Sequence, residues 1–318
     1  GAQLGAAKPK LCDDSDMIIT VKEPLEVEYE LFHEGQILYT YLHLAAAPGL
    51  IKFLQKRQIR AVAYETIQLK DGSLPLLTPM SEVAGKMSVQ IGAQFLEKHY
   101  GGRGVLLGGV PGVNRGVVTI IGGGVVGINA AKIAVGMGAR VNILDVSAPR
   151  LAYLDDVFGN AATTLMSHEE NILNAVTRAD LVIGAVLIPG AKAPSLVTET
   201  LVRQMRPGSV IVDVAVDQGG CVETAEVTSH DKPVIVKHGV LHYAVPNIPG
   251  AVSNTSTYAL TNVTLKYARA IARLGLEEAV KRDEALQKGV NVYKGKVTCA
   301  PVAQATGEKS AELATLLS

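Results

Sequence analysis

Short apolar runs alternate with helical patterns over the first part of the chain. Strand-like runs cover residues 17–21, 36–43 and 61–65, and a helical pattern covers 48–57 between the last two. Strands that alternate with helices are typical of βαβ units, whose strands lie parallel. The pattern therefore predicts an α/β domain built on a mostly parallel sheet.

A second region follows a turn-rich stretch at Asp71-Gly72. Ser81 stands where the N-cap of a long helix is expected, and a glycine-rich segment at 101–116 is predicted to form a hairpin or loop. Strands and helices then alternate again, which predicts a doubly wound sheet of about five or six strands. The runs expected as strands are 117–121, 141–145, 181–186, 210–216, 234–238 and 242–245.

The chain continues with two helical patterns that cannot extend this sheet. Apolar positions recur at helical spacing from Thr255 to Leu276, and another helix is expected from Glu277. We expect these helices to pack on the first domain, which makes that domain discontinuous. The predicted organisation is one α/β domain of residues 1–77 and 253–318, with the doubly wound domain of residues 78–252 inserted in it.

Composition narrows the classes of function. In 318 residues, 30 Lys and Arg balance 30 Asp and Glu, and 48% of residues are hydrophobic against 19% charged. These values argue against a disordered chain and against nucleic acid as a partner. We expect no membrane span and no membrane partner. The three cysteines have neither disulfide nor metal-ligand spacing, which favours a reducing, cytoplasmic setting and predicts no metal site.

The strongest local signal is a glycine turn between an apolar strand and an apolar helix. Gly122, Gly124 and Gly127 form a GxGxxG pattern, which allows a tight turn, an approach to a pyrophosphate and close helix packing. Asp145 ends the next strand and is expected to accept hydrogen bonds from a ribose while repelling a 2′-phosphate. The pattern predicts a Rossmann-type domain that binds NAD. Arg150 is expected either beside the adenosine or in solvent.

Two aspartates lie near the carboxyl end of the strand at 210–216, where open α/β sheets bind their ligands. Asp213 lies within the strand and is expected to be structural. Asp217 follows the strand and precedes Gln-Gly-Gly, so it is a candidate general acid or base. The alternative for Asp217 is a carboxylate that caps a loop.

Lys22 and His43 each lie at the carboxyl end of a predicted strand of the first domain. Alone, the lysine is consistent with a solvated side chain and the histidine with a hydrogen-bonded structural residue. Together they offer a cation for a carboxylate or carbonyl oxygen and a group that exchanges protons near neutrality. We therefore interpret the first domain as the one that carries the substrate.

The chain resembles the L-alanine dehydrogenase family over essentially its whole length. The motifs that carry the resemblance are VKEP, YLHLAA, PMSEVAG, GGVPGV, GGGVVG, IGAVLIPGAKAP, VDVAVDQGG and TSTYALTN. The resemblance implies a reversible, NAD-dependent oxidative deamination of L-alanine to pyruvate and ammonia by a cytoplasmic homohexamer. The NAD-binding component of proton-translocating transhydrogenase is similar in fold and glycine turn, but is not expected to carry the Lys22 and His43 pair.

The resemblance also implies roles for individual residues. Lys22 matches the substrate-binding lysine of the family, His43 the catalytic histidine and Asp217 the catalytic aspartate. The positions that line NAD in such enzymes correspond here to Ser81, Gly122, Gly124, Val125, Val126, Gly127, Asp145, Arg150, Ser167, Val186, Leu187, Val214, Val245, Asn247 and Ile248.

The start of the chain departs from the family pattern. Family members begin with a segment of about fifty residues whose arginine binds the substrate carboxylate, and no match to it is found ahead of VKEP. We therefore expect that this chain lacks that segment. A chain without this arginine could be a catalytically impaired NAD-binding fragment, and the similarity to transhydrogenase leaves a transhydrogenase-like NAD(H)-binding subunit as the other alternative.

Overall fold

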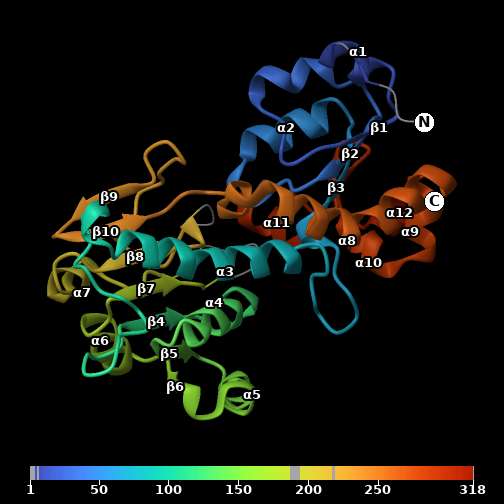
Figure 1. Cartoon of the computed structure of the whole chain (residues 1–318). Coiled ribbons are helices and arrows are strands. Elements are labelled where there is room, and N and C mark those ends of the chain that lie inside the picture. Colours follow the sequence, from blue (N-terminus) through green and yellow to red (C-terminus); the bar gives the residue numbers. More distant parts are fainter. Residues whose placement is uncertain (1–3, 6, 187–193, 217–218, 318) are drawn as a thin grey trace. The chain divides into compact units, whose positions relative to one another are not determined.

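The structure, a computed structural model, divides the chain into two compact units (Figure 1). The first unit joins Gly1–Pro79 to Thr257–Ser318, and the second unit is Met80–Ser256. The chain therefore passes from one unit to the other twice. The residues that the structure describes are 4–5, 7–186, 194–216 and 219–317.

The first unit contains a five-stranded sheet in the order β1-β2-β3-β11-β12. The strands β1 (Met17–Ile19), β2 (Ile37–Thr40) and β3 (Arg60–Ala63) are parallel, as the alternation of strands and helices predicted. The late strands β11 (Val290–Tyr293) and β12 (Lys296–Val297) add antiparallel pairs beyond β3. Sequence analysis did not predict these two late strands.

Helices cover this sheet and supply its core. The helix α2 (Pro48–Lys56) buries Leu50, Ile51 and Leu54 against Leu38 of β2 and other strand residues. Burial of apolar side chains on both elements stabilises the layer. The other helical segments of the unit are α1 (Lys8–Asp13), η1 (Glu26–Leu31), η2 (Leu44–Ala46), η3 (Tyr64–Thr66), α9 (Leu276–Arg282), α10 (Glu284–Gly289), α11 (Ala300–Thr306), α12 (Leu313–Leu317) and most of α8 (Ser253–Leu274).

The second unit contains a seven-stranded sheet in the order β6-β5-β4-β7-β8-β10-β9, parallel except for β9. The prediction of five or six strands was wrong because it missed β6, a threonine-containing edge strand with only one fully buried residue. The strands are β4 (Val117–Ile121), β5 (Arg140–Asp145), β6 (Ala162–Met166), β7 (Leu181–Gly184), β8 (Val210–Asp213), β9 (Val234–Lys237) and β10 (Val240–Tyr243).

The order of these strands reverses beside β4. From β4 the chain proceeds outward through β5 and β6, and then returns to place β7 on the other side of β4. In a doubly wound sheet such a reversal opens a ligand crevice at the carboxyl ends of the strands. The α/β fold with a Rossmann-type sheet is therefore confirmed, and its switch point lies between β4 and β7.

The long helix α3 (Thr78–Phe95) begins four residues earlier than the position after Ser81 at which it was predicted to begin. Ser81 therefore lies in the first turn and is not the N-cap, because Pro79 is readily accommodated at the start of a helix. The glycine-rich segment contains an antiparallel bridge between Val110 and Val113, as a hairpin requires. The other helical segments of the second unit are η4 (Lys98–Tyr100), α4 (Val125–Gly136), α5 (Ala148–Phe158), η5 (Gly159–Ala161), α6 (Glu169–Thr177), α7 (Glu199–Gln204) and η7 (Ile248–Val252).

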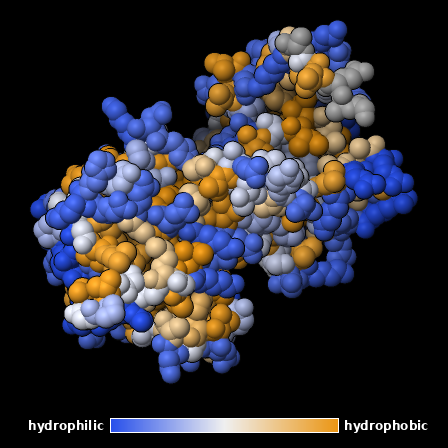
Figure 2. Space-filling model, in the orientation of Figure 1, coloured by the Kyte–Doolittle hydropathy of each residue, from blue (hydrophilic) through white to orange (hydrophobic). Residues whose placement is uncertain are grey.

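Hydrophilic and hydrophobic residues are intermixed on the face shown in Figure 2. Within the ranges that the structure describes, we find no helix that combines the length and the apolar character needed to cross a membrane.

Candidate functional site

The glycine turn leaves no room for side chains at its two ends. Gly122 has a φ of +101°, and a Cβ there would lie 2.6 Å from the carbonyl oxygen of Ala185. A Cβ on Gly127 would lie 1.9 Å from the carbonyl oxygen of Gly122. Only glycine permits backbone approaches this close. The segments β4, α4 and the residues after β7 are consequently packed backbone against backbone.

The middle of the turn is open. Gly124 is the N-cap of α4, and no heavy atom lies within 4 Å of a Cβ built on it. Val125 and Val126 follow in the first helical turn, where N–H groups have no acceptor within the helix. These amides and the positive end of the helix dipole favour an anion. The turn therefore fits the pyrophosphate of a dinucleotide such as NAD.

Asp145 fixes the turn from the end of β5. Its Oδ2 accepts a hydrogen bond from the N–H of Gly123 at 2.7 Å, and its Oδ1 accepts one from the N–H of Ser147 at 2.9 Å. A carboxylate has about four acceptor positions, so two amide bonds leave further lone pairs for a ligand. The partly exposed Asp145 is thus held in a fixed orientation beside the turn, as a ribose acceptor would need to be.

Arg150 contacts the turn itself. Its Nε donates to the carbonyl oxygen of Gly123 at 2.5 Å, and its guanidinium lies 4.8 Å from the ring centroid of Tyr153. Of the two expectations for Arg150, the purely solvated side chain is therefore wrong. Its positive charge lies next to the predicted pyrophosphate position.

The other predicted cofactor positions of the second unit follow the carboxyl ends of neighbouring strands. The N–H of Ser167, directly after β6, donates to the carbonyl oxygen of Asp145 at 2.9 Å, and the N–H of Val214 donates to that of Gly184 at 2.9 Å. Val186 follows β7 and is partly buried. The parallel strands therefore bring these residues to the edge of the sheet that carries the glycine turn.

The segment after β10 reaches the same edge, because β10 is parallel to β8. Val245 and Ile248 are both buried, whereas Asn247 is exposed. Asn247 adopts a left-handed conformation with a φ of +63° and precedes η7. Asparagine tolerates this conformation better than most residues with a side chain. The exposed Asn247 thus lies at the edge of the sheet that carries the glycine turn.

Ser81 approaches the turn from the helix α3. A Cβ on Gly85 would lie 2.2 Å from the carbonyl oxygen of Val126, so α3 and α4 are in backbone contact there. Residues four apart lie on the same face of a helix. Ser81 therefore lies one turn away from this contact, on the face of α3 that meets α4.

In the first unit, Lys22 and His43 are linked through a glutamate that sequence analysis did not single out. The Nζ of Lys22 lies 3.5 Å from Oε1 of Glu23, and Nδ1 of His43 lies 3.4 Å from Oε2 of the same carboxylate. The His43 contact has the length of an ion pair without the alignment of a hydrogen bond, and neither atom has another hydrogen-bond partner among the described residues. The two predicted groups therefore share one counter-ion.

A second glutamate, Glu65, holds the backbone of His43. The N–H of His43 donates to Oε1 of Glu65 at 2.7 Å, and the N–H of Leu42 donates to the same oxygen at 3.1 Å. His43 itself has a φ of +48°, in the left-handed region that side chains rarely adopt. The Glu65 carboxylate therefore stabilises a strained turn just past the end of β2.

The two carboxylates determine the protonation of His43. Burial alone disfavours the charged imidazole, but Glu23 and Glu65 outweigh burial, so the pKa of His43 is raised. The pKa of Glu23 is lowered in spite of its own burial, because His43 and Lys22 favour its charged form. With Nδ1 directed at Glu23, Nε2 is the ring nitrogen left for a ligand. Such a histidine can take up and release protons near neutral pH.

Asp213 is structural, as expected. It is fully buried, and its carboxylate accepts hydrogen bonds from the N–H groups of Ala215, Cys221 and Val222 at 3.1–3.3 Å. These bonds close the loop after β8. The predicted catalytic residue Asp217 and the predicted cofactor residue Leu187 lie outside the described residues.

Glu23 and Glu65 were missed for different reasons. Glu23 is adjacent to Lys22, so its sequence position was a usable signal. Glu65 follows β3 and reaches His43 only because β2 and β3 pair with Thr40 beside Ala63. Polar residues after adjacent parallel strands meet at one edge, and this rule could have drawn attention to Glu65.

Comparisons with known proteins point to one family. A family model described as the alanine dehydrogenase/PNT C-terminal domain matches residues 88–300, and one described as the alanine dehydrogenase/PNT N-terminal domain matches residues 1–84. Alanine dehydrogenase of Methanococcus maripaludis is 63% identical over 96% of this chain and 82% of that protein. Alanine dehydrogenase of Bacillus subtilis is 59% identical over 96% of this chain and 81% of that protein.

Solved structures agree with these relatives. An L-alanine dehydrogenase with 54% sequence identity has a TM-score of 0.91 and matches 96% of this chain and 84% of its own. A transhydrogenase from Sinorhizobium meliloti, at 22% identity, has a TM-score of 0.75 over 91% of this chain and 83% of its own, which shows a shared fold alone.

The N-terminal family model bears on the expected missing segment. This model matches the chain from residue 1 onward. The expectation that an N-terminal segment is lacking is therefore not supported by the comparison.

Proposed function

Since the chain belongs to the alanine dehydrogenase/PNT family, we propose that it is an oxidoreductase that interconverts L-alanine with pyruvate and ammonia using NAD. In the forward direction, L-alanine, water and NAD⁺ give pyruvate, ammonium, NADH and a proton. The high identity to curated alanine dehydrogenases over nearly the whole chain carries this proposal. The glycine turn and the Lys22, Glu23 and His43 cluster support it on chemical grounds.

The cofactor would be held by the second unit. The open amides at Val125 and Val126 would bind the pyrophosphate, and Asp145 would bind the adenosine ribose. The Asp145 carboxylate disfavours a 2′-phosphate, which supports NAD over NADP. Arg150 would add positive charge beside the pyrophosphate. When bound, NAD supplies a hydride acceptor for the Cα–H of alanine.

Lys22 and His43 would act on the substrate. The Lys22 ammonium would bind the carboxylate or carbonyl oxygen, where negative charge is greatest. Loss of hydride leaves an iminium carbon, to which water must add before ammonia can leave. His43, with Nε2 available, would take a proton from that water and return one to the departing nitrogen. Asp217 is proposed as the second proton-transfer group in these steps.

An assay with two substrates tests the proposal. The purified chain, given NADH with pyruvate and ammonium, should consume NADH, and omission of either substrate should abolish the consumption. A transhydrogenase-like subunit or an impaired NAD-binding fragment would instead bind NADH, as followed by its fluorescence, without turnover. That result would contradict a dehydrogenase.

We further propose a cytoplasmic homohexamer, on the strength of the resemblance to the family. Sedimentation equilibrium on the purified chain measures the assembled mass directly. A mass of six chains is expected, and a monomer at assay concentration would contradict this assembly.

A further inference from the structure

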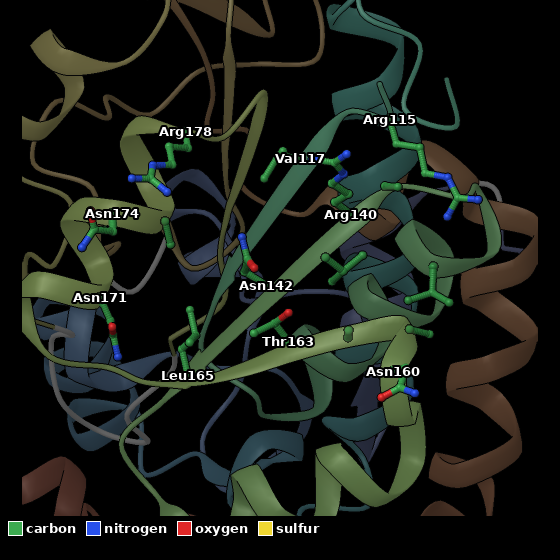
Figure 3. Close-up of a pocket in the computed structure, with 16 residues that line it drawn as sticks. Arg115, Val117, Arg140, Asn142, Asn160, Thr163, Leu165, Asn171, Asn174 and Arg178 are labelled. Carbon is green, nitrogen blue, oxygen red and sulfur yellow. The ribbon is translucent and has the colours of Figure 1, made fainter. Parts of the chain in front are cut away.

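A cavity of about 780 Å³ lies in the second unit, away from the glycine turn (Figure 3). Its lining includes Val117, Arg140 and Ala162, the first residues of β4, β5 and β6. The glycine turn follows the carboxyl end of β4, so the cavity and the turn lie at opposite ends of the same strands. Nucleotide binding in doubly wound sheets uses the carboxyl ends, which leaves this cavity without a role in that site.

The lining of the cavity carries positive charge and no negative charge. Three arginines, Arg115, Arg140 and Arg178, line it, and none of the sixteen lining residues shown in Figure 3 is acidic. The chain as a whole has zero formal net charge, so this is a local concentration of positive charge. Polar side chains that could donate further hydrogen bonds come from Asn142, Asn160, Thr163, Asn171 and Asn174.

Some other arginines of the same unit form ion pairs with carboxylates, whereas these three form none among the described residues. Arg103 and Arg206 both contact Oδ1 of Asp180, at 3.3 and 3.0 Å. Among the described residues, no carboxylate forms an ion pair with any of the three cavity arginines. Arg140 is instead oriented by a neutral group, since its Nη2 donates to Oδ1 of Asn114 at 3.0 Å. The exposed Arg140 is therefore oriented by a neutral side chain rather than by a carboxylate.

We propose that this cavity binds a multiply charged phosphate ligand, either a free polyphosphate or the phosphate end of a nucleotide. The guanidinium group presents a planar fork of donors that matches phosphate oxygens, and such charge-assisted bonds are the strong ones. The volume falls within the range of about 300–1,000 Å³ that small-molecule sites occupy. Alanine and valine residues also line the cavity, and the uncharged part of a nucleotide can pack against them.

Titration calorimetry of the full chain with tripolyphosphate tests this site. The variants are a double substitution, Arg140→Gln with Arg178→Gln, and the control Arg269→Gln, an exposed arginine of α8 in the other unit. The unsubstituted chain should bind with a dissociation constant of about 1 mM or below, and the double variant should bind at least about tenfold more weakly. The control should bind as the unsubstituted chain does. Thermal unfolding establishes that each variant is folded.

A parallel titration with ATP distinguishes the two sources of phosphate. ATP can also bind at the glycine turn, but the substitutions in the cavity leave that turn intact. The difference in ATP affinity between the double variant and the unsubstituted chain therefore measures binding in the cavity alone. Tighter cavity binding of ATP than of tripolyphosphate identifies a nucleotide site, and equal binding identifies a polyphosphate site. The proposal is overturned if the unsubstituted chain does not bind tripolyphosphate, or if the double variant and the control bind it equally. A double variant that changes only the oligomeric state would mark the cavity as a contact between copies and would overturn it too.

Discussion

His43 depends on carboxylates from two separate segments. Glu23 comes from the loop after β1 and faces the imidazole ring, whereas Glu65 comes from the segment after β3 and binds the backbone. Both carboxylates favour a proton on the ring, and Glu65 also maintains the left-handed turn that orients it. Glu23 therefore acts on the charge of this proposed catalytic group without holding its backbone, so a mutation of Glu23 changes the charge while the turn keeps its Glu65 hydrogen bonds.

We expect Glu23→Gln to lower the pKa of His43, because it removes the carboxylate that favours the charged imidazole. If neutral His43 acts as a base, activity in the direction of alanine oxidation is lost as the pH falls through that pKa. The acidic limb of the rate profile should then move to lower pH. Steady-state rates across pH, with NMR titration of the histidine ring, measure the shift.

The matched control is Glu26→Gln, which removes an exposed carboxylate from the same segment. Its rate profile should coincide with that of the unsubstituted chain. Identical profiles for Glu23→Gln and Glu26→Gln would show that Glu23 does not set the protonation of His43.

The proton-transfer role of His43 predicts a second outcome. His43→Ala should reduce turnover by about 10² or more, which is the usual contribution of a general acid or base. NADH affinity should stay nearly constant, because the proposed cofactor residues lie in the other unit. Initial rates and NADH fluorescence titration give the two values. Turnover at the unsubstituted level would remove His43 from the mechanism.

The conformation of the glycine turn was predicted correctly because its signal is local in sequence. Gly122, Gly127 and Asp145 were predictable because a strand, a turn and the next strand fix their spacing. The role of Glu65 was not predictable in the same way, because it depends on which strands become neighbours and in which register. Contacts of that kind are set by the tertiary structure.

The stability of the second unit and its proposed NADH binding both depend on the glycine turn. Gly127→Ala would place a methyl group 1.9 Å from the carbonyl oxygen of Gly122, so α4 would have to move away from β4. We expect a loss of stability of about 2 kcal/mol or more, in the range of overpacked sites, and weaker NADH binding. Chemical denaturation and fluorescence titration measure the two effects.

Gly136→Ala provides the control within the same helix. No heavy atom lies within 4 Å of a Cβ built at Gly136, which ends α4. Alanine is favoured over glycine in helices by up to about 1 kcal/mol, so this variant should be neutral or slightly more stable. Equal destabilisation by both substitutions would contradict the argument from close backbone approach.

Strands were predicted best where both faces of the sheet are buried. The strands β4, β7 and β8 are apolar runs, so their sequences alone identify them. The strand β6 lies at the edge of the sheet and is half exposed, so it lacks a continuous apolar run. In the sequence, β11 is a short segment far from the other strands of its sheet. Its position beside β3 follows only from the completed fold.

At the scale of the whole molecule, the second unit is one uninterrupted segment. Its core cluster draws on α3, α4 and the strands of one sheet, without residues from the first unit. We expect a fragment of residues 78–256 to fold on its own and to bind NADH within roughly tenfold of the affinity of the full chain. Circular dichroism with thermal unfolding and NADH titration test this. A fragment without cooperative unfolding would contradict the independence of this unit.

The stability of the folded chain should depend on one buried histidine. His242 is 1% exposed, its Nε2 lies 2.8 Å from Oγ1 of Thr224, and burial lowers its pKa. The unfolded chain therefore binds the proton more readily than the folded chain. The free energy of unfolding should fall as the pH drops below about 6.5, the ordinary value for histidine.

Denaturant unfolding at about pH 5 and about pH 7.5 measures this dependence. His242→Gln should flatten it, whereas His230→Gln, at an exposed position, should leave it unchanged. An unaltered pH dependence in His242→Gln would assign the effect to other groups.

The place of β11 in the first sheet has a consequence for synthesis of the chain. The sheet of the first unit is complete only when Val290–Tyr293 lies beside β3, yet β3 is made more than two hundred residues earlier. Domains generally fold from the N-terminus as the ribosome extends the chain. Here the inserted unit is fully translated first, so the proposed cofactor-binding unit can fold while the proposed substrate-binding unit still waits for its last strands.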